Sequence, residues 1–186
     1  MYSIELMTEE HCHIQRMLKV IQHICCHIAE GGEINSPEQY EIIDFIRNYA
    51  DKHHHGKEEK ILFPVMSELN PLAKNVIDTG MLVEHQLGRA QVMGWETALK
   101  LWQKEPKTEF KVDMISYAMG YAHLLQEHTE KENNAVYTLA ERIIPEERKS
   151  EIDTQVRSFE EEQKQAGIQQ KYLNLLEKLE NKYIGG

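Results

Sequence analysis

Four histidines and two glutamates form a repeated set in this chain. The second half repeats the first at a constant spacing of 74 residues, and the positions are His11, His54 and Glu58, then His85, His128 and Glu132. The glutamates that precede two of them, Glu10 and Glu84, keep the same spacing. A constant offset over several chemically active residues predicts two similar helical hairpins related by an approximate twofold axis.

Each half carries one His-x-x-x-Glu pair, His54 with Glu58 and His128 with Glu132. On an α-helix, residues four apart lie about 40° from each other around the axis and one turn apart, so each pair points at one locus. Both pairs fall among apolar residues, where an unpaired charge is costly. Bound cations would compensate six such groups, and helical bundles build two-metal sites from inward side chains.

The number and type of donor groups predict a pair of metal ions. Four imidazoles and two carboxylates are too many for one tetrahedral ion that keeps an open position. We expect one metal chiefly on each hairpin, with Glu58 and Glu132 as bridges or caps. Nitrogen and oxygen donors without thiolate favour non-haem iron, then manganese, with zinc as a third choice. Open coordination positions would then bind water, oxide or a small ligand.

Several neighbours of the set have alternative roles. His53 and His55 flank His54 at about 100° on either side, and one of them could reach the site as a fifth histidine or an outer donor, with His55 the choice of the two. Tyr121 shares the apolar face of the fourth helix, where packing is a commoner role than a hydrogen bond near the metals. Three cations can neutralise outer carboxylates, although solvated charge is the commoner role: Lys57, Arg89 and Lys131. Four other histidines are expected to be solvated: His13, His23, His27 and His123.

Apolar residues spaced by threes and fours predict four helices that would position this set. They are expected over residues 5–30, 37–69, 80–103 and 107–144. Ser36 is the expected N-cap of the second helix, and Pro64 should kink or end it. The segment from Asp78 to Gly80 is expected to cap the third. Residues 1–145 therefore predict an all-α bundle.

The remaining residues, 146–186, are rich in charge but keep an apolar stripe at helical spacing. They predict one long accessory helix. We expect its stripe to pack on its own bundle, and the alternative is a homodimer formed through this helix. A chain of 186 residues suits one globular domain with such an extension.

Charge and cysteine usage exclude several classes of function. The net charge of −10 disfavours binding to nucleic acid or anionic lipid. No apolar run approaches the roughly 18 residues that span a membrane, and the acidic start lacks the basic residues of a signal peptide. Three cysteines, Cys12, Cys25 and Cys26, do not suit a disulfide framework. A cytoplasmic protein with reduced thiols is expected.

Four stretches carry a resemblance to a known family: Glu10-His11 with Ile14, His54 to Pro64, Glu84-His85, and His128 to Glu132. With them the chain resembles the hemerythrin-like family, the HHE cation-binding domains, over roughly residues 5–145. The resemblance implies an up-down-up-down four-helix bundle that holds a non-haem di-iron centre with an oxo or hydroxo bridge. The residues similar to the family's ligands are His11, His54, Glu58, His85, His128 and Glu132.

The chain departs from the oxygen-carrying members of that family. Their third helix has a His-x-x-x-His pair, whereas Met81 and Arg89 stand four residues either side of His85 here. Their last motif is His-x-x-x-x-Asp, and here it is His-x-x-x-Glu. One histidine fewer implies at least one more open position. We expect a protein that binds or senses O2 or NO. The alternatives are a di-iron oxidoreductase or iron-handling protein in oxidative or nitrosative stress, and a metal-free helical interaction module, so enzyme activity is left open.

Overall fold

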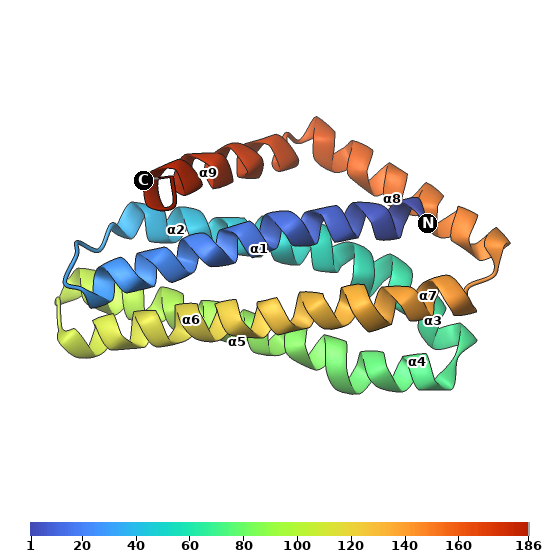
Figure 1. Ribbon diagram of the computed structural model, residues 1–186, viewed down its shortest axis with the longest axis horizontal. Helices are drawn as coiled ribbons and strands as arrows, with labels where there is room; N and C mark the ends of the chain where they lie inside the picture. Colours follow the sequence, from blue (N-terminus) through green and yellow to red (C-terminus); the bar gives the residue numbers. More distant parts are fainter. Residues whose placement is uncertain (186) are drawn as a thin grey trace.

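The computed structural model describes residues 1–185 and is all-helical over this range (Figure 1). The all-α prediction is confirmed. In chain order the elements are α1 (Tyr2–Ala29), α2 (Ser36–Phe45), the π-helical η1 (Ile46–His55) and η2 (Glu58–Leu62), α3 (Phe63–Leu69), α4 (Pro71–Val76), the π-helical η3 (Ile77–Met81), α5 (Leu82–Lys104), α6 (Thr108–Lys131), the π-helical η4 (Glu132–Val136), α7 (Tyr137–Ile143), α8 (Glu146–Gln165) and α9 (Ile168–Tyr183).

Helical conformation is continuous over 2–29, 36–69, 71–104 and 108–143, and these four stretches form a helical bundle (Figure 1). Two predicted starts were wrong. Asn35 caps the second stretch in place of Ser36, because its side chain accepts the Glu38 backbone N–H. The third begins at Pro71, since the Asn70 side chain already accepts the N–H groups of Leu72 and Ala73.

Proline 64 does not end the second stretch. It stands in the first turn of α3, directly after η2. Proline lacks the N–H that would continue the ladder of hydrogen bonds, but its fixed φ suits a helix, so one bond is lost without ending the stretch. The chain therefore stays helical to Leu69, and the site residues of this stretch belong to one continuous helical segment.

The π-helical segments η2 and η4 lie 74 residues apart and shift the inward face of both hairpins by one residue. A π turn closes i→i+5 hydrogen bonds and so contains one residue more than an α turn. At the ends of these segments the buried positions are Leu62 and Val136. An uninterrupted α-helical spacing from the histidines would instead turn Ile61 and Ala135 inward, but Ile61 is half-buried and Ala135 exposed.

The apolar interior consists of two clusters along the bundle. One contains Ile14, Leu18, Val92, Trp95 and Leu125 among others. The other contains Met7, Leu62, Met66, Val136 and Ala140 among others. On each of the four helical stretches the predicted metal-binding residues fall between the parts that enter the two clusters. The polar set is therefore a layer enclosed by apolar packing at both ends.

The C-terminal extension is two helices, α8 and α9, instead of the single helix predicted. They are separated at Gly167, whose positive φ of 68° favours glycine. Tyr172, Leu176 and Leu179 of α9 are buried in the first cluster, and α8 supplies buried residues to the second. Figure 1 shows both helices lying over α1. The apolar stripe thus packs on its own bundle.

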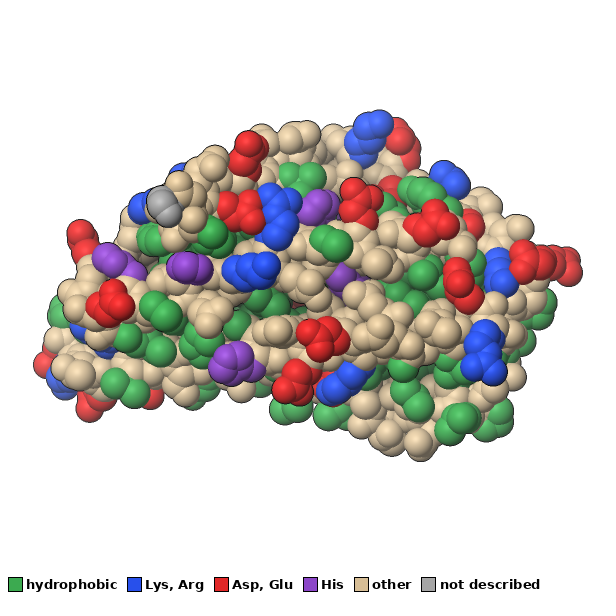
Figure 2. Space-filling model, in the orientation of Figure 1, with side chains coloured by type: hydrophobic (Ala, Val, Ile, Leu, Met, Phe, Trp, Pro, Cys, Tyr) green, Lys and Arg blue, Asp and Glu red, His purple; other side chains and the backbone are tan. Residues whose placement is uncertain are grey.

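The outer surface carries mixed charge. Figure 2 shows acidic and basic side chains interspersed over the face on which α1, α8 and α9 lie. Within the described range, no helix combines the length and apolar character that crossing a membrane requires.

Candidate metal centre

The structure brings all six predicted residues together in the interior of the bundle. Their relative exposures do not exceed 1% for His11, His54, Glu58, His85, His128 and Glu132. Each hairpin supplies two histidines and one glutamate to the layer. The 74-residue repeat of the sequence therefore corresponds to a convergence in space.

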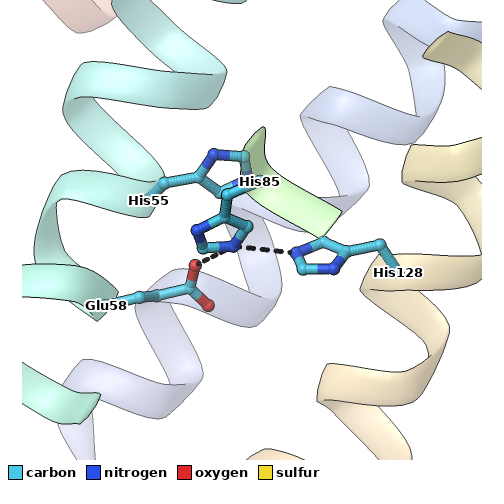
Figure 3. Close-up of side chains that lie close together, drawn as sticks. All are labelled: His55, Glu58, His85 and His128. Atoms are coloured by element: carbon cyan, nitrogen blue, oxygen red, sulfur yellow. Dashed lines mark hydrogen bonds and ion pairs between the residues drawn. The ribbon is translucent and has the colours of Figure 1, made fainter. Parts of the chain in front are cut away.

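The donor atoms form two overlapping groups, and within each group all lie within 4.8 Å of one another. The first group is His11, His54, Glu58 and Glu132, and the second is His55, Glu58, His85 and His128. Figure 3 shows the second group, with His55 and Glu58 on one helical stretch and His85 and His128 converging on them from two others. Glu58 belongs to both groups, so its carboxylate lies between them.

Two distances describe how each carboxylate faces the imidazoles. Glu132 Oε2 lies 3.2 Å from both His11 Nε2 and His128 Nε2. Glu58 Oε2 lies 3.6 Å from His85 Nε2, and the other oxygen, Oε1, lies 3.8 Å from His54 Nε2. Both carboxylates therefore contact histidines from both hairpins.

His55, offered by the sequence as one alternative, lies inside the layer. It is buried, and its ring stacks on His85 at 3.8 Å between centroids. Regular α-helical geometry puts consecutive residues about 100° apart, but the π-helical η1 ends at this residue and alters which side chains face inward. The run of three histidines from His53 was the only sequence signal for it.

Several polar atoms of this layer have no hydrogen-bond partner among residues 1–185. They are His54 Nε2, His55 Nε2, Glu58 Oε2 and both carboxylate oxygens of Glu132. Buried polar atoms are almost always paired, and each one left alone costs about 1–3 kcal/mol. Unpaired imidazole nitrogens and carboxylate oxygens directed at a common locus fit a cation of the iron, manganese or zinc type.

The Nδ1 atoms of the histidines are held from outside the layer, in the same way in both hairpins. His54 Nδ1 donates to Glu10 Oε2 and His128 Nδ1 donates to Glu84 Oε2, each at 2.8 Å. A carboxylate can only accept, so it fixes the proton on Nδ1 and leaves Nε2 turned inward. The repeat had singled out Glu10 and Glu84, but not this contact.

A second repeat-related pair holds the other two histidines. His11 Nδ1 lies 2.8 Å from Asn133 Oδ1, and His85 Nδ1 lies 2.7 Å from Glu59 Oε1. Residues 59 and 133 are again 74 positions apart. Sequence reasoning missed Asn133, because asparagine and glutamate differ, although the constant offset was a signal that could have found it.

Tyr137 is a further residue that sequence reasoning missed. It stands 74 residues after Phe63 in the repeat, but its hydroxyl donates to Glu58 Oε1 at 2.6 Å and its ring stacks on His11. Burial and the nearby Glu58 raise the pKa of the Tyr137 phenol well above its usual value. The hydroxyl thus stays protonated and orients Glu58. Tyr121, the tyrosine considered from sequence, is buried by packing.

The two carboxylates differ in charge. Burial, and then the neighbouring Glu132, raise the pKa of Glu58 well above its usual value. Burial opposes ionisation of Glu132 as well, but His128 and His11 outweigh it and hold its pKa well below the usual range. Glu132 together with Glu84 raises the pKa of His128 to about 10, against the effect of burial. Positive charge beside Glu132 therefore stabilises its carboxylate, and a bound cation would supply such charge in place of a protonated His128.

His54 carries no such charge. Burial and the charge of His11 lower the pKa of His54 to about 4, although Glu10 acts in the opposite direction. The imidazole is consequently neutral at physiological pH, and a neutral imidazole is the form that binds metals.

All three flanking cations pair with outer carboxylates, and the expectation of solvated charge was wrong for Lys57, which is buried. Lys57 is fully buried and contacts Glu10 and Glu160. Arg89 pairs with Asp51 and Glu59 at 2.6 and 2.7 Å, and Lys131 pairs with Glu84 at 2.6 Å. Glu160 lies on α8, more than a hundred residues from Lys57, and local periodicity carries no information about such a contact.

A cavity of about 280 Å³ adjoins the second group. Its lining includes His55, His85, Gly88, Arg89, Val92 and Tyr121. The rest of the lining mixes apolar side chains with polar and charged ones, among them Arg47, Asn48, Asp51 and Lys52. Two residues of the polar layer thus face this space. A small molecule in this cavity would contact the layer directly.

The histidines expected to be exposed lie largely apart from the layer. His23, His27 and His123 are exposed, while His13 is half-buried and lies 2.7 Å from the Tyr49 hydroxyl.

Comparison with protein families gives a match to the model described as Hemerythrin HHE cation binding domain, over residues 2–140. The match covers the four helical stretches up to α7 and leaves out α8 and α9. Comparison with curated proteins and with solved structures gives no match.

Proposed function

Because the chain belongs to the Hemerythrin HHE cation-binding domain family, we propose that its buried layer holds two iron ions and binds or senses a small diatomic ligand, O2 or NO. The observation that carries this proposal is the set of unpaired nitrogen and oxygen atoms on His54, His55, Glu58 and Glu132. No other group among residues 1–185 satisfies them.

The two overlapping groups suggest how the ligands are divided. One ion would be held by His11, His54 and Glu132, the other by His85, His128 and His55, with Glu58 shared between them. An oxo or hydroxo bridge would complete the pair, in an up-down-up-down four-helix bundle. Manganese and zinc use the same donor types and are alternatives to iron. When bound, the ions would supply open coordination positions and a change of oxidation state.

The chain's own residues would orient and shield this centre. Glu10, Glu84, Glu59 and Asn133 hold the Nδ1 atoms of the four histidines, which keeps every Nε2 inward. Such outer contacts raise ligand basicity and fix ring orientation. The cavity lined by His55 and Tyr121 would admit a small ligand and exclude a large one.

An oxidoreductase or iron-handling role is the second candidate. The cavity of about 280 Å³ is larger than a single diatomic molecule needs, since one water occupies only about 30 Å³ in the liquid. The space would therefore admit peroxide or a second reactant. Turnover would then replace simple binding as the function.

Metal analysis and optical spectroscopy of the freshly purified protein test the first candidate. About two iron ions per chain and a reversible spectral change on adding O2 or NO are expected. Steady consumption of O2, NO or peroxide with an electron donor would favour the oxidoreductase instead. Negligible metal, with melting unchanged by a chelator, would favour a metal-free interaction module, since a real site stabilises the fold.

A further inference from the structure

We propose that the C-terminal extension is part of the metal centre, and that Glu160 of α8 positions His54 through Lys57 and Glu10. The inference rests on the proposed function, because it concerns an ion held by His54. It goes further in assigning a role to a helix outside the family match, which ends at residue 140.

An unbroken series of polar contacts leads from α8 to the histidine. Glu160 Oε1 accepts from Lys57 Nζ, and the same ammonium donates to Glu10 Oε1. The other oxygen of Glu10, Oε2, accepts from His54 Nδ1 at 2.8 Å. Lys57 thus joins the extension to the one carboxylate that orients His54.

This series lies in the interior. Lys57 is 0% exposed, Glu10 3% and Glu160 9%. A buried ammonium between two carboxylates is held firmly, because removing either partner leaves charge uncompensated in a medium of low dielectric constant. Loss of Glu160 would therefore be expected to move Lys57, and with it Glu10.

Both helices of the extension close over this cluster. The Lys57 ammonium lies 5.6 Å from the centroid of the Phe159 ring on α8, and the His53 ring lies 5.7 Å from the same centroid. From α9, Gln169 donates to Glu160 Oε2. The carboxylate of Glu160 is thereby held on both oxygens, one by the bundle and one by the extension.

The cluster is not a third metal site, although Glu10, His53 and Glu160 have suitable donor atoms. The ammonium of Lys57 contacts Glu10 and Glu160 and lies 3.2 Å from His53 Nε2. It occupies the position a cation would need, so the lysine itself supplies the positive charge.

The other hairpin has no equivalent arrangement among the described residues. Its lysine, Lys131, contacts Glu84 but has a side chain 48% exposed, and no second carboxylate pairs with it. Water can replace such a contact at little cost. The extension therefore breaks the twofold symmetry of the bundle, and it would make the ion position at His54 more rigid than the one at His128.

The test compares Glu160→Gln with wild type and with Glu161→Gln, an exposed neighbour on the same helix. Each full-length protein is loaded with iron, and iron loss to excess EDTA is followed by absorbance and by metal analysis. Losing a carboxylate that directly holds a ligand typically costs about 10–100-fold in affinity. Because Glu160 acts on Glu10 through Lys57, we expect one of the two ions to leave Glu160→Gln faster by about the lower end of that range, tenfold. Glu161→Gln should behave as wild type.

Several results separate the explanations. If wild type holds no iron, the proposed function is wrong. If wild type holds two ions and Glu160→Gln releases both at the wild-type rate, the proposed role of Glu160 is wrong. Equal acceleration of both ions would also overturn it, since it would mean a general loosening of the fold. Should Glu160→Gln not fold, Gln169→Ala tests the same link, and selective loss of one ion is again expected.

Discussion

Glu10 and Glu84 accept the Nδ1 hydrogens of His54 and His128 at the same distance, 2.8 Å, from opposite halves of the bundle. They differ in surroundings. The Glu10 side chain is 4% exposed and lies against a buried lysine, whereas the Glu84 side chain is 17% exposed and its lysine reaches solvent. The hydrogen bonds of Glu10 and Glu84, although equivalent in the repeat, should therefore contribute different free energies to stability.

The first prediction is that Glu10→Gln costs much more stability than Glu84→Gln. Removing one partner of a buried pair typically costs about 3–5 kcal/mol, whereas a partly exposed ion pair contributes about 0–1 kcal/mol. Urea unfolding of both iron-free variants measures the difference. Similar losses in the two variants would contradict the burial of Lys57 beside Glu10.

The second prediction concerns metal content. His54→Ala and Glu132→Ala should each lose at least one of the two iron ions, because both side chains present unpaired donor atoms to the layer. His23→Ala is the control, since His23 is exposed. Iron analysis after dialysis measures the outcome, and equal losses in all three variants would rule out the assignment.

The third prediction is that Tyr137→Phe destabilises the protein by about 1 kcal/mol, the usual value of one hydrogen bond. The phenyl ring keeps the stacking on His11, and the hydroxyl's short contact to Glu58 Oε1 is lost together with a long one, 3.5 Å, to His11 Nε2. Thermal melting measures the loss, and the optical spectrum should shift because Glu58 is reoriented. Tyr117→Phe, at an exposed position, is the control. A spectrum identical to wild type would show that Tyr137 does not orient Glu58.

The fourth prediction concerns acid and the docking of α8. The Asp153 carboxylate accepts from the backbone N–H groups of Tyr2 and Ser3 and from the Ser3 hydroxyl. Burial acts the other way, but these bonds hold the Asp153 pKa below its usual 3.8. A depressed pKa contributes stability that is complete above 3.8 and is lost as the pH falls through the lower folded value.

Asp153→Asn should therefore lower the stability of the protein at neutral pH and reduce its dependence on pH below about 4. Denaturant unfolding at a series of pH values measures both effects. Glu151→Gln is a suitable control on the same helix, because Glu151 is exposed. An unchanged acid dependence in Asp153→Asn would mean that the contact does not hold α8 to the N-terminus.

The sequence by itself determined the helical class, the repeat and the six residues of the layer. About one helical turn separates His54 from Glu58 and His128 from Glu132. Such local spacing can be recognised in the sequence without any tertiary contact. The constant offset of 74 then required that two similar hairpins present the same groups. The helical class and the His/Glu pairs depend on residues close together in the chain, and the match between the hairpins depends on the constant offset of the repeat.

Only the tertiary structure decided which neighbours complete the layer. The π-helical segments change which side chains face inward, and His55, at the end of η1, lies in the layer for this reason. An extra residue in a turn is stabilised by packing between helices and leaves no periodic signal in the sequence. Lys57 became buried since Glu160 approaches from a helix folded back over α1. Tyr137 reaches Glu58 for the same reason: contacts between distant segments depend on how the helices pack.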